Sequence, residues 1–143
     1  ITNDKAIKVF NDGDLSRDFT HVDDIVIGVK SVLLTDSSTK KLYELYNIGN
    51  NKPVVLTKFI EIIEKYLGKK SIKKMLPMQD GDAKKTWASI SKIKKDYNFQ
   101  NNVSLDKGIE EFINWFKVYH KVWFNEELLK NQTLLFLIYL SKN

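Results

Sequence analysis

Two polar loops carry the residue types best suited to binding chemistry. They span residues 13–24 and 76–87, and each is flanked by apolar residues typical of a core, where a rigid scaffold commonly presents binding groups. The first loop contains Arg17, the single arginine among 23 basic residues. A guanidinium is a planar fork that matches a phosphate or a carboxylate, and lysine cannot reproduce it. Arg17 therefore indicates an anion-binding site, with a surface ion pair to Asp14 or Asp18 as the alternative.

The patterns of a complete catalytic site are absent from the sequence. It has no cysteine, no glycine-rich phosphate loop and no G-x-S-x-G nucleophile motif. His21 and His120 lie far apart and lack metal-ligand spacing, which favours structural roles for both. Asp23 and Asp24 are adjacent, so on a helix they suit the first-turn dipole better than a carboxylate pair. We expect no catalytic residue and no metal site.

The composition favours one small folded domain. The 143 residues are 43% hydrophobic, and no apolar run approaches the roughly 20 residues of a membrane span. The net charge of +5 comes with 22 lysines, but their doublets are scattered and do not interleave with aromatic residues as in a nucleic-acid surface. No signal peptide is recognisable. We expect a cytoplasmic protein that binds neither nucleic acid nor membrane.

Hydrophobic periodicity predicts short strands and helices separated by polar loops. Strands are expected at residues 7–10, 42–48 and 71–76, with an extended piece at 17–20. A first helix after this piece has an apolar face made of Val22, Ile25, Val26, Val29 and Leu33.

Three further helices follow in the pattern. One has Thr57 as its N-cap and ends at Gly68, and a short one is capped by Ser89 or Ser91 and ends near Tyr97. The last begins after Ser104, with a stripe that we expect to be buried: Leu105, Ile109, Phe112, Ile113, Phe116 and Tyr119. These elements indicate an α+β fold or a piece of an α/β fold.

Four motifs give the sequence a family resemblance. Residues 17–25 match R-D-F-T/V-Y/H-V-D-D-I/V, residues 46–50 match Y-N-I/L-G-N, residues 77–82 match P-M-Q-x-G-D, and residues 112–116 match the end of a final helix. From Ile1 to Tyr119 the chain resembles the C-terminal, substrate-binding part of the NAD-dependent epimerase/dehydratases, which are extended short-chain dehydrogenase/reductases that act on nucleotide sugars. The resemblance is strongest to UDP-glucuronate 4-epimerases, because the loop carries glutamine where galactose epimerases usually have arginine.

The resemblance implies a set of substrate-binding residues. Arg17 would grip the UDP diphosphate, and Asp82 would reach the ribose hydroxyls. The strand that carries Lys8 and Phe10 would lie against the uracil, and Gln79 would add an amide near the nucleotide. Phe10 as a plain core residue and Gly81-Asp82 as a simple turn remain the alternatives. Asp80, where the family usually has proline, would place an extra negative charge beside the diphosphate.

The resemblance also implies what this chain lacks. The family's N-terminal Rossmann half carries the NAD-binding glycine motif, the catalytic Ser/Thr and a catalytic Tyr-x-x-x-Lys pair, and we find no counterpart of that half here. We therefore expect a small α+β nucleotide-sugar-binding lobe of an extended Rossmann-type epimerase, inactive alone and without bound NAD. It would be half of a split enzyme or the remnant of a truncated gene. The alternatives are a dTDP-sugar 4,6-dehydratase-like fragment and a non-catalytic module that docks on a full-length relative.

The expected organisation is a lobe over residues 1–119 and an extra apolar tail over residues 120–143. The tail has no counterpart in the family pattern, and its apolar residues predict a helix that is apolar on nearly all sides. Such a helix favours burial. The expected partners are a UDP-sugar and either a separate Rossmann-half protein or a second copy of the chain.

Overall fold

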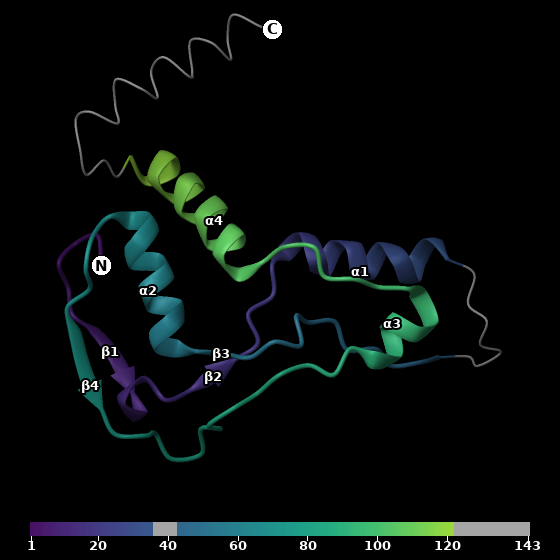
Figure 1. The fold of residues 1–143 in the computed structure, drawn as a ribbon, viewed down its shortest axis with the longest axis horizontal. Helices are drawn as coiled ribbons and strands as arrows, with labels where there is room; N and C mark the ends of the chain where they lie inside the picture. The colour runs from purple at the N-terminus through teal and green to yellow at the C-terminus, as the bar shows by residue number, and fades with distance from the viewer. Residues whose placement is uncertain (36–42, 122–143) are drawn as a thin grey trace, which may run out of the picture.

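The computed structural model describes residues 1–35 and 43–121, which form a small α+β fold (Figure 1). The elements in chain order are β1 (Ile7–Phe10), the 3-10 helix η1 (Asn11–Gly13), β2 (Ser16–Arg17), α1 (Val22–Leu34), β3 (Val54–Val55), α2 (Leu56–Leu67), β4 (Lys73–Leu76), α3 (Ser91–Tyr97) and α4 (Leu105–His120). The predicted tail over 120–143 lies outside the described residues from Val122 onward. Within the described ranges, no helix is both long and apolar enough to cross a membrane.

Two short sheets connect segments that are distant in sequence. β1 pairs with β4 in parallel, with Phe10 opposite Leu76, and β2 pairs with β3 in antiparallel register, with Arg17 opposite Val54. Both strands of the first sheet were predicted. The sharp turn between β1 and β2 needs Gly13, which has a φ of +83° and whose missing Cβ would lie 2.4 Å from the Thr57 side chain.

One hydrophobic cluster joins α2 to α4. Its buried members are Ile62, Leu67, Ile109 and Ile113. The ends of both helices follow from their sequences: Gly68 closes α2 in the left-handed conformation, and the Ser104 hydroxyl accepts a hydrogen bond from the Lys107 amide at the start of α4. Thr57 is not an N-cap, because α2 already begins at Leu56.

A second cluster holds the other end of the molecule, where α1 and α3 lie (Figure 1). Ile90, Ile93 and Phe99 are almost fully buried, and Tyr46 and Ile48 pack against them. Neither Ser89 nor Ser91 caps α3, since Ile90 occupies the N-cap position without a side-chain bond.

A buried carboxylate ties β4 to α2. Glu64 is 3% exposed and accepts hydrogen bonds from the Ser71 amide and hydroxyl at 3.0 and 2.6 Å and from the Lys73 ammonium at 2.5 Å. The Lys73 and Ser71 donors hold the pKa of Glu64 far below its ordinary value. The carboxylate therefore stays ionised although it is buried, and it fixes the start of the strand that leads to the second polar loop.

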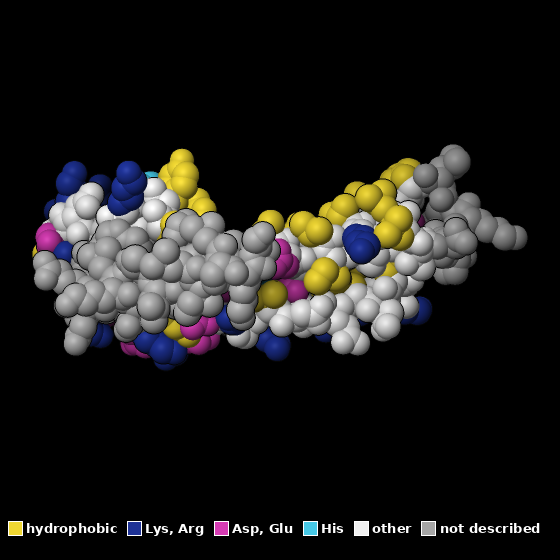
Figure 2. All heavy atoms as spheres, turned by 90° about the horizontal axis from the view of Figure 1, so that it is seen from above, with side chains coloured by type: hydrophobic (Ala, Val, Ile, Leu, Met, Phe, Trp, Pro, Cys, Tyr) yellow, Lys and Arg dark blue, Asp and Glu magenta, His cyan; other side chains and the backbone are white. Residues whose placement is uncertain are grey.

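Three expectations about burial were wrong. The apolar face of α1 points outward, with Val22, Val26 and Leu33 at 64%, 56% and 76% exposure, while Asp24 and Gly28 face the interior. Figure 2 shows hydrophobic side chains gathered over α1. Phe112 and Tyr119, both assigned to the buried stripe of α4, are 51% and 68% exposed.

The expected strand at 42–48 was also not found. Leu42 lies outside the described residues, and 43–48 pairs with no described strand. Its exposure nevertheless alternates with period two, as in a strand with one covered face. Tyr43 and Leu45 are each 82% exposed.

Candidate functional site

The two principal residues predicted to bind a nucleotide, Arg17 and Asp82, lie in contact. A guanidinium nitrogen of Arg17 lies 2.6 Å from Oδ1 of Asp82, although 65 residues separate them in sequence. Both side chains are about one-third exposed, at 31% and 33%. The fold thus places a cationic fork and a carboxylate side by side at the surface. The alternative sequence interpretation, an ion pair of Arg17 with Asp14 or Asp18, was wrong about the partner.

Backbone pairing sets this contact. The Ser16 amide donates to the Lys84 carbonyl at 2.8 Å, and the Thr86 amide donates to the Ser16 carbonyl at 3.1 Å. The second polar loop therefore runs beside β2 as a third short strand would. Arg17 also donates to the Ser16 carbonyl at 2.9 Å, which orients its guanidinium along the loop.

The Gly81-Asp82 pair does form a turn, but it is not only a turn. The Asp82 amide donates to the Gln79 carbonyl at 3.2 Å, and Gly81 has a φ of +80°, as glycine at the third position of a type II turn commonly has. This turn reverses the loop so that the Asp82 side chain faces Arg17. The turn therefore also positions the Asp82 carboxylate against Arg17.

Most other residues of the 17–25 motif are structural. The Asp18 carboxylate accepts hydrogen bonds from the amides of Asn51 at 2.9 Å, Lys52 at 3.3 Å and Ala88 at 3.1 Å. The buried Asp24 carboxylate accepts from the amides of residues 102 and 103 at 2.8 and 3.3 Å. These acids hold loops in place, whereas the Arg17 side chain is about one-third exposed and pairs with Asp82.

A cavity of about 430 Å³ opens beside Arg17. Asn47, Thr86 and Trp87 line it together with Arg17, and Trp87 is 55% exposed. The sequence analysis did not assign these three residues to the site. Asn47 lies within the Y-N-I-G-N motif and Thr86 follows the P-M-Q-x-G-D loop, so motif membership was the signal that could have found them.

The remaining predicted binding residues lie apart from the ion pair. Lys8 and Phe10 are on β1, opposite Lys74 and Leu76 of β4, and Gln79 is exposed in the turn. Within the described part of the chain, no hydrogen bond or ion pair links these three side chains to Arg17 or Asp82. Leu76 leads directly into the loop that carries Asp82, so β1 and the ion pair flank the same loop. Their roles toward a ligand remain predictions.

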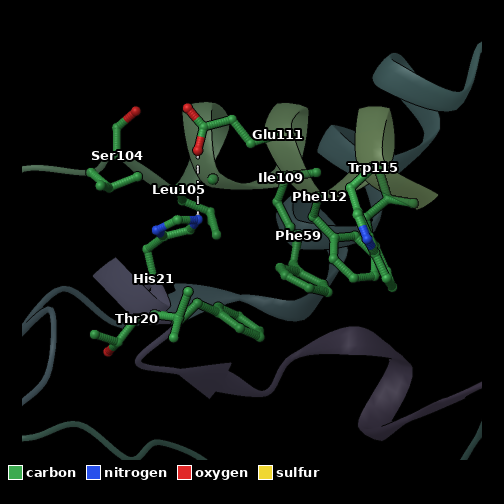
Figure 3. Close-up of a pocket in the computed structure, with 14 residues that line it drawn as sticks. Thr20, His21, Phe59, Ser104, Leu105, Ile109, Glu111, Phe112 and Trp115 are labelled. Carbon is green, nitrogen blue, oxygen red and sulfur yellow. Dashed lines mark ion pairs between the residues drawn. The ribbon is translucent and has the colours of Figure 1, made fainter. Parts of the chain in front are cut away.

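A larger, mainly apolar pocket of about 540 Å³ lies between α2, α4 and the start of α1 (Figure 3). The rings of Phe19 and Phe59 stack on one wall with centroids 4.0 Å apart, and Phe112 and Trp115 line the α4 side. Thr20 lines both this pocket and the cavity beside Arg17. The 17–22 segment therefore separates a polar site from an apolar one.

His21 stands at this pocket as a structural residue. Its Nδ1 accepts a hydrogen bond from the Asp23 amide at 3.3 Å and so caps α1, and its Nε2 lies 3.7 Å from a Glu111 oxygen (Figure 3). His21, Asp23 and Glu111 each bring a potential ligand atom within 4.8 Å of the others. Because the cap uses Nδ1 and both carboxylates are exposed, the cluster is accounted for by the start of α1.

One correction concerns the catalytic pair of the family. The spacing Tyr-x-x-x-Lys does occur here, at Tyr66 and Lys70, although the sequence analysis found no counterpart. The Tyr66 hydroxyl donates to Asp106, and the Lys70 ammonium lies 3.0 Å from Glu64 with its side chain 87% exposed. α2 ends at Leu67, before Lys70. Tyr66 joins α2 to α4, Lys70 pairs with α2 itself, and neither residue lines the cavity beside Arg17.

Comparison with known proteins identifies relatives of this arrangement. No protein-family model matches the sequence. A UDP-glucuronate 4-epimerase of Thermodesulfobacterium geofontis is 40% identical over 133 residues, which cover 92% of this chain and 38% of the relative. An uncharacterized protein of Methanocaldococcus jannaschii is 46% identical over 112 residues, covering 78% of this chain and 33% of the relative.

A solved structure supports the same relationship. The UDP-glucuronic acid 4-epimerase of Bacillus cereus, in complex with UDP-glucuronic acid and NAD, superposes with a TM-score of 0.69 at 33% identity, over 80% of this chain and 37% of that one. The chain spans a third to two fifths of the length of these relatives. It is a homologue of part of the NAD-dependent epimerase/dehydratases, in agreement with the predicted C-terminal part. Among these enzymes, UDP-glucuronate 4-epimerases are its relatives.

Replacing Asp18 with asparagine tests the structural role of this carboxylate. We expect the free energy of unfolding to fall by about 1–3 kcal/mol, because the asparagine amide would face the backbone donors that the carboxylate now accepts. Urea denaturation measures the change. Asp14→Asn is the matched control, since the Asp14 side chain is 74% exposed and pairs with Lys84 at 3.5 Å. Equal losses in the two variants would contradict the assignment.

Proposed function

We propose that this chain binds the nucleotide part of a UDP-sugar, as the substrate-binding lobe of a UDP-glucuronate 4-epimerase-like protein. The observation that carries the proposal is the contact of Arg17 with Asp82 beside an open cavity. Arg17 and Asp82 are assigned to neighbouring parts of one nucleotide. They are 65 residues apart in sequence, yet their side chains are in contact. The relatives support the proposal, since the Bacillus cereus enzyme is described with UDP-glucuronic acid bound.

The chemistry of the two side chains suits a nucleoside diphosphate. Arg17 offers several donors in a planar fork for the diphosphate oxygens, and Asp82 accepts hydrogen bonds from ribose hydroxyls. Phe10 and Lys8 would flank the uracil from β1, with Gln79 contributing an amide. The cavity beside Arg17, which Asn47, Thr86 and Trp87 also line, would receive the sugar.

Ligand binding must then break an existing interaction. In this structure the guanidinium that would bind the diphosphate is already held by Asp82. An ion pair exposed by about a third contributes about 1 kcal/mol or less, which a diphosphate with more charge and more acceptors can replace. The Asp82 carboxylate becomes free to accept from the ribose in the same step. The pair orients both groups before the ligand arrives.

The residues described here do not fit NAD. All six glycines are separated from one another, so none forms the phosphate cradle of a dinucleotide site. The N-terminal turns of α1 and α4 are capped by His21 and Ser104. NAD, which supplies the hydride chemistry of this class of enzyme, is therefore assigned no residue of this chain. What the chain contributes to catalysis is substrate binding that positions the reacting carbon.

The exposed face of α1 is the proposed docking surface for a cofactor-binding partner. Val22, Val26 and Leu33 lie on this face, and each is more than half exposed. A partner with a complementary apolar face would cover these side chains. A separate Rossmann-half protein has this chemistry, and we propose it over a second copy of the chain for this surface.

The lone chain is expected to produce no epimerised sugar. Because we assign neither a cofactor site nor a proton-transfer pair near Arg17 to residues 1–35 and 43–121, incubation with UDP-glucuronic acid and NAD should leave the C4 configuration unchanged. Nuclear magnetic resonance of the sugar protons measures the outcome, with a full-length 4-epimerase as positive control. Formation of the C4 epimer by the purified chain, with host enzymes excluded, would overturn this part of the proposal.

Arg17→Lys tests the diphosphate assignment. Lysine keeps the charge but loses the fork, so UDP affinity should fall by about 1–3 kcal/mol, the scale of a charge-assisted hydrogen bond. Isothermal titration calorimetry measures the affinity. Lys95→Ala is a suitable control because Lys95 is exposed on α3 and lines neither described cavity. Equal UDP affinity in wild type and Arg17→Lys would refute the assignment.

Asp82→Asn separates the ribose from the diphosphate. Loss of the ion pair frees the Arg17 guanidinium, so inorganic pyrophosphate should bind the variant more tightly than the wild type. The affinity of the variant for UDP should rise less than its affinity for pyrophosphate, or should fall, because the variant lacks the carboxylate acceptor for the ribose hydroxyls. The ratio of UDP to pyrophosphate affinity is thus expected to fall. An unchanged ratio would show that Asp82 does not contact the nucleoside, and dTDP as a third ligand tests the preference for uracil.

A further inference from the structure

A third cavity, of about 360 Å³, lies where residues 50–52 meet α3 and the loop that follows it. Most of the side chains that line it carry a carboxamide group: Asn50, Asn51, Asn98, Gln100 and Asn101. Lys52 and Lys94 also line it, and no carboxylate of the described residues does. Phe99, the apolar residue in this lining, is only 2% exposed. The described lining is therefore polar and carries positive charge without a compensating acid.

The fold itself explains three of the carboxamide residues. The Asn50 side chain donates to the Phe19 carbonyl at 3.2 Å. The Asn101 side chain donates to the Gly49 carbonyl at 2.7 Å. Asn51 has a φ of +57°, a conformation that asparagine adopts more readily than most residues. These residues fix the walls of the cavity, and the other polar side chains have no such structural role.

The two lysines of the cavity lack acidic partners. Within residues 1–35 and 43–121, the ammonium groups of Lys52 and Lys94 form neither an ion pair nor a hydrogen bond. By contrast, Lys65, Lys73 and Lys92 lie 3.0, 2.5 and 2.9 Å from a carboxylate oxygen. Two unpaired cations at one cavity create a positive potential, which attracts an anion. The cavity therefore favours a ligand with negative charge.

The remaining carboxamides favour hydroxyl groups on the same ligand. In the described part of the chain, the side chains of Asn98 and Gln100 form no hydrogen bond. Each of them offers both donors and an acceptor, and a hydroxyl can use either kind of group. A simple carboxylate would leave the acceptors unused, because it brings no donor. A neutral sugar would leave the two lysines unused.

This cavity is separate from the nucleotide site. Its lining shares no residue with the cavity beside Arg17. The Asp18 carboxylate lies between the two, because it accepts from the amides of Asn51 and Lys52 and also lines the cavity beside Arg17. A ligand of the third cavity therefore goes beyond the proposed function.

We propose that this cavity binds a sugar acid, a polyhydroxylated molecule that carries a carboxylate. Lys52 and Lys94 bind the carboxylate, and the carboxamides of Asn98 and Gln100 bind hydroxyls. The volume of about 360 Å³ is at the low end of the roughly 300–1,000 Å³ of small-molecule sites, which suits a single sugar unit.

A titration of the full chain followed by nuclear magnetic resonance tests this proposal. Sodium glucuronate, glucose and sodium acetate are compared at equal ionic strength, because only the first combines a carboxylate with several hydroxyls. We expect glucuronate to shift the backbone amide signals of residues 50–52 and 98–101 and to bind several-fold more tightly than the other two. Affinity for glucose or acetate equal to that for glucuronate would overturn the proposal. Shifts at Asn47, Thr86 and Trp87 in place of these would assign glucuronate to the cavity beside Arg17, with the same consequence.

Lys94→Ala removes one of the two cations and should weaken glucuronate binding several-fold. Lys95→Ala is the matched control, since Lys95 is the next residue of α3, is exposed and does not line the cavity. Equal affinities of the two variants would contradict the assignment. Thermal unfolding shows whether the fold is retained, and Lys52→Ala repeats the test from the opposite wall if Lys94→Ala fails to fold.

Gln100→Ala tests the hydroxyl contacts. It should weaken the binding of glucuronate and leave the weak binding of acetate unchanged, whereas Asn102→Ala, exposed and outside the lining, should change neither. A loss of glucuronate affinity no larger than in Asn102→Ala would overturn this part of the proposal. UDP affinity should be unaffected by Lys94→Ala, and glucuronate affinity by Arg17→Lys. Failure here and failure of the proposed function are therefore distinguishable.

Discussion

The fold depends on carboxylates that accept backbone hydrogen bonds, because its two sheets are too small to hold the loops. Each sheet has two strands, and β2 and β3 contain two residues each. The segment after β2 therefore uses Asp18 and Asp24 in place of a ladder, binding the 51–52, 88 and 102–103 amides. Each of the two carboxylates pairs with backbone amides that no sheet ladder would otherwise satisfy. These contacts hold three other segments around the first polar loop, while backbone pairing of Ser16 with Lys84 and Thr86 holds the loop that carries Asp82.

The same constraint explains why Gly49 lies in the Y-N-I-G-N motif. A Cβ at this position would lie 2.5 Å from the Ala88 Cβ and 2.8 Å from an Asp18 carboxylate oxygen. Those distances are too short for any other residue, so the close approach of three segments requires glycine. At Gly49 the motif therefore forms a junction between segments. Arg17 remains available for a ligand because its neighbour Asp18 performs the structural task.

Two charge clusters with different burial illustrate how the chain separates stability from binding. Glu64 is 3% exposed and is satisfied by Ser71 and Lys73, which makes it a permanent part of the α2–β4 connection. Arg17 and Asp82 are exposed by about a third, where water screens their attraction. Removing a partner from the buried Glu64 cluster would leave an unpaired charge, whereas the exposed Arg17–Asp82 pair can exchange one partner for another with little loss of free energy. A binding site needs a pair that can exchange partners.

Local signals in the sequence predicted where elements begin and end better than they predicted which face of an element is buried. The strand at 7–10, the stop at Gly68 and the start at Ser104 depend on neighbouring residues, and all three were confirmed. The orientation of α1 was wrong because periodicity identifies an apolar face without showing what covers it. The buried face of α1 instead carries Asp24, whose burial depends on amides 78 residues away and is invisible to any local pattern.

In the site, too, local motifs identified individual residues but not the contacts between distant segments. Motifs predicted Arg17 and Asp82 separately, and only the structure shows that they pair with each other. Asn47, Thr86 and Trp87 were missed as cavity residues because no single residue type indicates a cavity, which arises where three segments meet. Phe10, Lys8 and Gln79 depend on a ligand for their assignment, so their roles stay predictions that the UDP titrations address.

The outward face of α1 and the exposed rings of α4 are chemically different apolar surfaces. Val22, Val26 and Leu33 of α1 are aliphatic and each more than half exposed. Phe112, Trp115 and Tyr119 of α4 are aromatic, and their ring centroids lie 5.7 and 5.2 Å apart in succession. Within each helix the backbone groups pair with one another, so a group that covers either surface needs to match side chains alone.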